Sequence, residues 1–167
     1  MSLLSRRKFI KHSFLSSVIL LTSGSKLLGA TTPLQTIAVV QNDLFPATGL
    51  VPSGQYINAN GYLRKILNHS RVSDVDKEFI KDGAKWLNEE SVAKFKKPYE
   101  QLSKDQREKV LKIVVDTDWG ESWISTIMNY LLEALLGDPI YGGNKGKIGW
   151  KWLNHKGGIP RPTKACL

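Results

Sequence analysis

Apolar residues recur at helical spacing over most of the chain after about Asn58, and this pattern predicts a mainly α-helical protein. Ser73 is placed to cap one of these helices, because Asp74 and Asp76 follow it and acidic residues favour the first turn. The residues expected to face the core from this part of the chain are Tyr62, Leu63, Ile66, Leu67, Val75, Phe79, Ile80, Ala84 and Leu87.

Two more helices are predicted further along the chain. Ser103 and Gln106 have the spacing of a capping box, and the helix that they open is expected to run to about Val115. A broad apolar face over Trp119–Leu136 predicts the clearest helix, which Gly137 is placed to end. The residues expected to face inward are Val110, Leu111, Val114 and Val115 in the first helix, and Trp119, Trp123, Ile124, Ile127, Met128, Leu131, Leu132, Leu135 and Leu136 in the second.

The segments that flank the helices predict long irregular loops at both ends of a small helical domain. Residues 31–56 are rich in Pro, Gly, Thr and Asn, so an extended surface loop is expected there. Within it, the short apolar run Ile37–Val40 fits either a strand or a turn of helix.

The tail from Asp138 onward carries aromatic residues between glycines and prolines. Tyr141, Trp150 and Trp152 have no periodic face on which to be buried, so they are expected to pack on a surface elsewhere. Gly142 and its neighbour Gly143 predict a tight turn with positive φ.

The N-terminal residues 1–30 have the layout of an export signal, with a basic start, a short apolar stretch and a polar end. Arg6 and Arg7, followed by Phe9, fill the twin-arginine pattern that the twin-arginine translocase reads. The predicted organisation is therefore a signal over 1–30 and a single helical domain over 31–167. The expected destination is the periplasm.

Charge and cysteine content exclude several classes of protein. Of the 167 residues, 24 are Lys or Arg and 15 are Asp or Glu, which gives a net charge of +9. Five of the bases and none of the acids lie in residues 1–30, so the remainder carries only +4 and no basic cluster that would indicate nucleic-acid binding. A single cysteine excludes an internal disulfide and an all-cysteine metal site.

Three carboxylates close together are the strongest candidate for catalysis. Asp116, Asp118 and Glu121 lie beside Trp119 and Trp123, as a carboxylate pair with aromatic platforms would in a carbohydrate-active protein. The alternative is a helix start, with Asp118 as the cap and Glu121 in the first turn. The alternative explains every one of these residues.

Two short motifs resemble the gluconate 2-dehydrogenase subunit 3 family. One is Leu44–Thr48, and the other is Asp138–Asn144 followed by Gly149–Lys151. The resemblance implies a small subunit without catalytic, cofactor or metal residues of its own, in a complex at the periplasmic side of the inner membrane. The complex would contain a large FAD-dependent subunit that oxidises gluconate at C2, and a possible cytochrome c subunit with haem c.

That resemblance assigns the chain an escort role, in which it carries the folded flavoprotein through export and stabilises it. The expected partner interface is Tyr141, Gly142, Gly143, Trp150 and Trp152. The other interpretations are a stand-alone periplasmic carbohydrate-active protein and a binding module for another exported enzyme.

Cys166 is the only cysteine and the second-last residue. In an oxidising compartment such a cysteine suggests an intermolecular bridge or a free thiol. The prediction is a disulfide to the large subunit.

Overall fold

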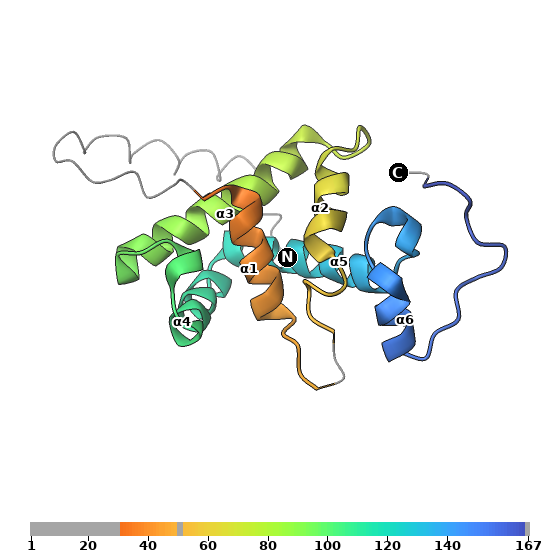
Figure 1. Cartoon of the computed structure of the whole chain (residues 1–167). Coiled ribbons are helices and arrows are strands. Elements are labelled where there is room, and N and C mark those ends of the chain that lie inside the picture. The colour runs from red at the N-terminus through yellow and green to blue at the C-terminus, as the bar shows by residue number, and fades with distance from the viewer. Residues whose placement is uncertain (1–30, 50–51, 166–167) are drawn as a thin grey trace, which may run out of the picture. The chain divides into compact units, whose positions relative to one another are not determined.

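The computed structural model describes residues 31–49 and 52–165, and these residues form six α-helices and no strand (Figure 1). The mainly helical class is confirmed. The helices are α1 (Pro33–Leu44), α2 (Ala59–Leu67), α3 (Asp74–Phe95), α4 (Lys104–Val115), α5 (Asp118–Leu136) and α6 (Ile148–Trp152). Three short 3₁₀ turns, η2 (Tyr99–Gln101), η3 (Pro139–Tyr141) and η4 (Lys145–Lys147), lie between them.

Helix α5 is the element on which the others assemble. It contacts α1, α2, α3, α4 and α6. Helix α4 leads into its N-terminal end, and α6 lies against its C-terminal end (Figure 1). An apolar face this broad on one helix needs neighbours on several sides to bury it.

Two apolar clusters lie along α5. In the first, Trp123 and Ile127 pack with side chains from α1, α2, α3 and α4. In the second, Leu131 and Leu135 pack with α2 and with the segment just before it. Tyr130 packs against both clusters, so the two form one continuous interior along the helix.

The predicted helix starts are confirmed by their caps. The Ser73 hydroxyl accepts a hydrogen bond from the Asp76 N–H at 3.1 Å. Ser103 and Gln106 form the reciprocal capping box that their spacing predicts. Gly137 is the C-cap of α5, and its N–H donates to the Glu133 carbonyl.

The expected loop over 31–56 is wrong for its first half, which is helix α1. The Thr32 hydroxyl and Gln35 form a capping box, and Pro33 occupies the first turn, where no N–H is needed. Ile37 and Val40 are fully buried, so the short apolar run is the inner face of this helix. The prediction failed because the run alone is too short to show a helical period.

Some apolar residues expected in the core are exposed. Val75 is 75% exposed because it lies in the first turn of α3, beyond the packed part of the helix, and Val115 is exposed at the last residue of α4. Leu132 and Leu136 on α5 are also exposed, although Ile124, further toward the start of the same helix, packs against the first cluster. The apolar face of α5 is therefore broader than its neighbours cover.

Candidate functional site

Residues 138–151, which contain the longer motif, form a cap around the C-terminal end of α5; we call this segment the helix-end cap. The Trp150 indole N–H donates to the Leu136 carbonyl at 2.7 Å. The Asn144 side-chain amide donates to the Gly137 carbonyl at 3.0 Å. Carbonyls at a helix end have no partner within the helix, so these two side chains supply the bonds that are missing.

Glycines let the helix-end cap approach α5 closely. A Cβ on Gly143 would lie 2.5 Å from the Ala134 carbonyl oxygen, and a Cβ on Gly149 would lie 2.2 Å from that of Leu135. Gly142 has φ +98°, as the tight turn predicts, whereas close packing accounts for Gly143. The glycines of the motif are therefore structural requirements of this chain.

Asn144 and Asp138 close the turns of the helix-end cap. Asn144 is fully buried, and its Oδ1 accepts from the Gly149 N–H at 2.8 Å. The Asp138 carboxylate accepts from the Ile140 N–H and makes two hydrogen bonds with the Arg161 guanidinium, at 2.8 and 2.9 Å. The hydrogen bond from Arg161, followed by that from Ile140, holds the pKa of Asp138 below its usual value.

Trp150 is buried by residues of this chain. It is 7% exposed, Arg161 lies over its ring and the His155 ring packs against its edge. The expectation that the tail aromatics have no helix face is thus wrong for Trp150, which lies on α6. A five-residue helix is too short to leave a period in the sequence. Trp152, which is 37% exposed, is the aromatic that stays accessible.

The structure brings together the segments in which the two motifs lie. The Phe45 ring lies edge-on to the Trp152 ring, with centroids 6.0 Å apart. The Asn58 side chain, in the loop that follows the first motif, donates to the Gly142 carbonyl at 2.7 Å. Segments about a hundred positions apart therefore meet at one place, which we call the loop–tail face and define by Phe45, Asn58, Gly142 and Trp152.

Tyr141 belongs to the interior beside this face. It is partly buried and packs against the second apolar cluster. In the same cluster, the Tyr62 hydroxyl donates to the Glu133 carboxylate at 2.9 Å. Burial, and then the hydrogen bond to Glu133, raise the pKa of Tyr62 above its ordinary value.

The three candidate carboxylates lie at the junction of two helices. Asp116 is the C-cap of α4, while Asp118 and Glu121 are in the first turn of α5. The cap is not Asp118 as predicted but Thr117, whose hydroxyl accepts from the Gly120 N–H at 3.1 Å. All three carboxylates are exposed.

The neighbouring tryptophans give these carboxylates no platform for a sugar ring. Trp123 is fully buried, and its indole N–H donates to the Ile80 carbonyl at 2.9 Å. Trp119 is partly buried and packs edge-on to Trp86 at 5.2 Å. The helix-start interpretation accounts for the whole group.

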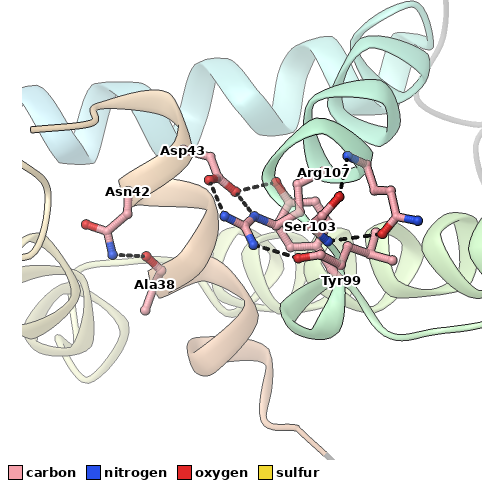
Figure 2. A network of polar contacts seen from close by, with 8 residues as sticks. Ala38, Asn42, Asp43, Tyr99, Ser103 and Arg107 are labelled. Carbon is pink, nitrogen blue, oxygen red and sulfur yellow. Dashed lines mark hydrogen bonds and ion pairs between the residues drawn. The ribbon is translucent and has the colours of Figure 1, made fainter.

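A mostly buried ion pair that the sequence did not reveal ties α1 to α4 (Figure 2). The Arg107 guanidinium donates to both oxygens of Asp43, at 2.7 and 3.1 Å, and to the Leu102 carbonyl at 2.8 Å. The Tyr99 hydroxyl donates to the same carboxylate at 2.8 Å. Burial, and then Asp43, raise the pKa of Tyr99. The only available signal was an acidic residue beside Leu44, in the last turn of α1.

Two cavities lie between the described elements. The larger, of about 320 Å³, lies between α1, residues 54–58 and the start of α2. The smaller, of about 200 Å³, is an apolar groove between α1, α4 and α5, with Leu44, Leu111 and Ile124 in its walls. Neither is lined by the three candidate carboxylates.

Residues 31–49 and 52–165 contain no group of three or more His, Cys, Asp and Glu that could hold a metal ion. None of the helices in those ranges has the length and the apolar character that a membrane span requires. The predicted signal residues Arg6, Arg7 and Phe9, and the predicted disulfide residue Cys166, lie outside the described residues.

The fold and its motifs thus define a small helical protein whose motif residues cap a helix and join two distant segments. The model of the family "Gluconate 2-dehydrogenase subunit 3" matches residues 32–158, most of the chain, and the chain belongs to that family. Proteins of this family are subunits of a dehydrogenase complex. No curated protein and no solved structure matches the chain.

Proposed function

We propose that this chain is the non-catalytic small subunit of a periplasmic, FAD-dependent gluconate 2-dehydrogenase complex, and that it escorts and stabilises the flavoprotein subunit. The observation that carries the proposal is the family match over residues 32–158. In the proposed complex the large subunit holds FAD, a cytochrome subunit with haem c accepts the electrons, and this chain supplies the export signal.

The geometry of the loop–tail face supports a binding role. Phe45 belongs to the first family-like motif, Trp152 directly follows the second, the two rings pack against each other, and Trp152 stays accessible. Accessible aromatic side chains on a rigid support are common anchors of protein interfaces. The buried motif residues, among them Trp150 and Gly143, would hold this face in place without touching the partner.

The escort role is tested by conservative substitution in the leader. Arg6→Lys together with Arg7→Lys keeps the charge but removes the pattern that the translocase reads, so the dye-linked dehydrogenase activity should remain in the cytoplasm. The flavoprotein itself should be retained there, if it has no leader of its own. The matched control is Arg64→Lys with Arg71→Lys in the helical domain, which should leave the activity periplasmic. Normal periplasmic activity of the leader variant would refute the escort role.

A disulfide from Cys166 to the large subunit is a further part of the proposal. The purified complex should then give a band at the summed mass on a non-reducing gel, and this band should split on reduction. Two separate bands without reductant, with Cys166 readily alkylated, would show that non-covalent contacts hold the subunits together.

A further inference from the structure

The larger cavity has walls made mostly of carboxamide side chains, and we call it the carboxamide pocket. It lies beside the loop–tail face, because Asn58 both lines the pocket and bonds to Gly142. None of the described residues that line it is ionisable. The carboxamides in its walls are Gln41, Asn42, Gln55, Asn58 and Asn60.

Three of these carboxamides already bind main-chain groups of this chain. The Asn42 side chain donates to the Ala38 carbonyl at 3.0 Å, as Figure 2 shows, and accepts from the Gln55 N–H at 2.9 Å. Asn58 donates to the Gly142 carbonyl, and the Asn60 side chain donates to a carbonyl at the start of α1 at 2.9 Å. The pocket is thus built from groups that recognise peptide units.

Gln41 is the exception. Gln41 lines the pocket and is only 1% exposed, and its Nε2, which is buried beneath the pocket surface, has no hydrogen-bond acceptor among the described residues. A buried donor without an acceptor is costly, so native structures seldom keep one without a reason. Gly54 approaches the Gln41 backbone so closely that an added Cβ would lie 3.0 Å from its carbonyl oxygen, which holds this side of the pocket in place.

We infer that the carboxamide pocket binds a short extended segment of the flavoprotein subunit, and that the Gln41 side chain turns toward this segment so that its Nε2 donates to a main-chain carbonyl. The inference rests on the proposed function. A neutral wall of amides suits an uncharged peptide chain, whose carbonyls and N–H groups match its donors and acceptors. The volume of about 320 Å³ is at the lower end of the roughly 300–1,000 Å³ typical of ligand pockets, which fits a short stretch of main chain.

The first test replaces the unpaired donor by an apolar group of similar shape. Gln41→Met in the full chain should leave the melting temperature of the isolated subunit unchanged or raise it, because an unsatisfied buried donor is removed. Its affinity for the purified flavoprotein subunit should fall by about tenfold, because the ligand carbonyl loses its donor. The matched control is Gln101→Met on the exposed surface, which should change neither quantity. Unchanged affinity of the Gln41→Met variant would overturn the inference.

A second variant keeps the test decisive if the first does not fold. The Gln55 side chain is exposed and only its backbone N–H is bonded to Asn42, so Gln55→Trp obstructs the pocket without altering the core. Binding should weaken at least tenfold relative to Gln101→Trp. If the wild-type subunit binds the flavoprotein and Gln55→Trp binds equally well, the inference fails while the proposed function stands. If the wild-type subunit does not bind the flavoprotein at all, both fail.

Cross-linking identifies the occupant. The photoreactive p-benzoylphenylalanine in place of the exposed Tyr56, which follows Gln55 and does not itself line the pocket, should cross-link, in the assembled complex, to one short contiguous segment of the flavoprotein, which mass spectrometry locates. A complex that assembles without such a cross-link, or a pocket that retains a small neutral molecule or water only, would refute the peptide assignment.

Discussion

The first apolar cluster and the helix-end cap are stabilised by different interactions. In the cluster, side chains at helical spacing from four helices pack around Trp123 and Ile127 of α5, and one ion pair joins α1 to α4. In the helix-end cap, side chains bond to the carbonyls of α5, and glycines allow the backbones to meet. The stability of the cluster depends on the volume that its apolar side chains fill. The stability of the helix-end cap depends on two side-chain donors and on the absence of side chains at Gly143 and Gly149.

This difference shows how one short chain can carry both a stable body and a motif that caps the end of a helix. The cluster provides the stability, because burying apolar surface is the dominant favourable contribution to folding. The helix-end cap buries little, but it fixes the position of Trp152 relative to Phe45. Damage to the cluster should therefore unfold the domain, and damage to the cap should loosen one end.

The largest effect is expected from the ion pair of the first cluster. Asp43→Asn leaves the mostly buried Arg107 guanidinium without a counter-charge, which should lower the free energy of unfolding by about 2–3 kcal/mol, somewhat less than for a fully buried pair. Urea denaturation measures the change. The exposed pair of Glu108 and Lys112 is the control, and Lys112→Gln should give no resolvable change. Equal effects of the two variants would contradict the structural role given to Asp43.

A smaller and more local effect is expected in the helix-end cap. Gly149→Ala places a Cβ against the Leu135 carbonyl, so the cap must shift, at a cost of about 1–3 kcal/mol. Tryptophan fluorescence should report the displacement of Trp150, and hydrogen exchange should accelerate at the last amides of α5 only. Gly158→Ala, where an added Cβ meets nothing within 4 Å, is the control. Exchange that accelerates across the whole domain would show that cap and cluster unfold as one unit.

The sequence predicted the part of the fold that depends on periodicity. Capping residues located the starts of α3 and α4, and the apolar period located α5 almost to the residue. The resemblance to the family was also carried by short motifs visible in the sequence. These features are local, so a single chain read in order contains them.

The sequence could not predict what depends on distant contacts. No spacing indicates that Asp43 meets Arg107, or that Asn58 bonds to Gly142, because 64 and 84 positions separate the partners. The burial of Trp150 within this chain could not be predicted for the same reason, since its acceptor is a helix-end carbonyl rather than a side chain. A buried donor such as Gln41 Nε2 becomes visible only when its surroundings are placed.

The pH dependence of the free energy of unfolding at alkaline pH allows the two regions to be compared, through Tyr99 in the first cluster and Tyr62 near the helix-end cap. An unfolded tyrosine loses its proton near pH 10, whereas burial and Asp43 raise the pKa of Tyr99 in the fold. Its contribution to stability is therefore complete below pH 10 and declines above it, by about 1.4 kcal/mol per pH unit. Tyr99→Phe should remove this slope, and Tyr62→Phe a similar one near the cap, as measured by urea denaturation between pH 9 and 11. Tyr56→Phe on the surface is the control, and a slope unaffected by Tyr99→Phe would contradict the assignment.

The smallest effect on stability, and a large one on binding, is expected at Trp152. Truncation at Gly137 cannot test the docking role of the tail, because it also removes Trp150 and the cap of α5. Trp152→Ala avoids this problem, since it loses only the edge contact with Phe45 and part of the burial, which should cost at most about 1 kcal/mol. If Trp152 is an anchor, the affinity for the flavoprotein subunit should nevertheless fall by about tenfold, measured by titration of the purified subunits.

The control for that experiment is Ile159→Ala, a substitution of another exposed apolar residue in the same tail, which should leave the affinity unchanged. Two outcomes of the Trp152→Ala titration distinguish the role of the helix-end cap from that of the first cluster. A loss of affinity at unchanged stability would show that the helix-end cap positions a binding residue, in contrast to the cluster, whose variants should lose affinity only as far as they unfold. Unchanged affinity in Trp152→Ala would instead remove the loop–tail face from the interface and leave the carboxamide pocket as the remaining contact to examine, because the pocket variants alter neither Trp152 nor Phe45.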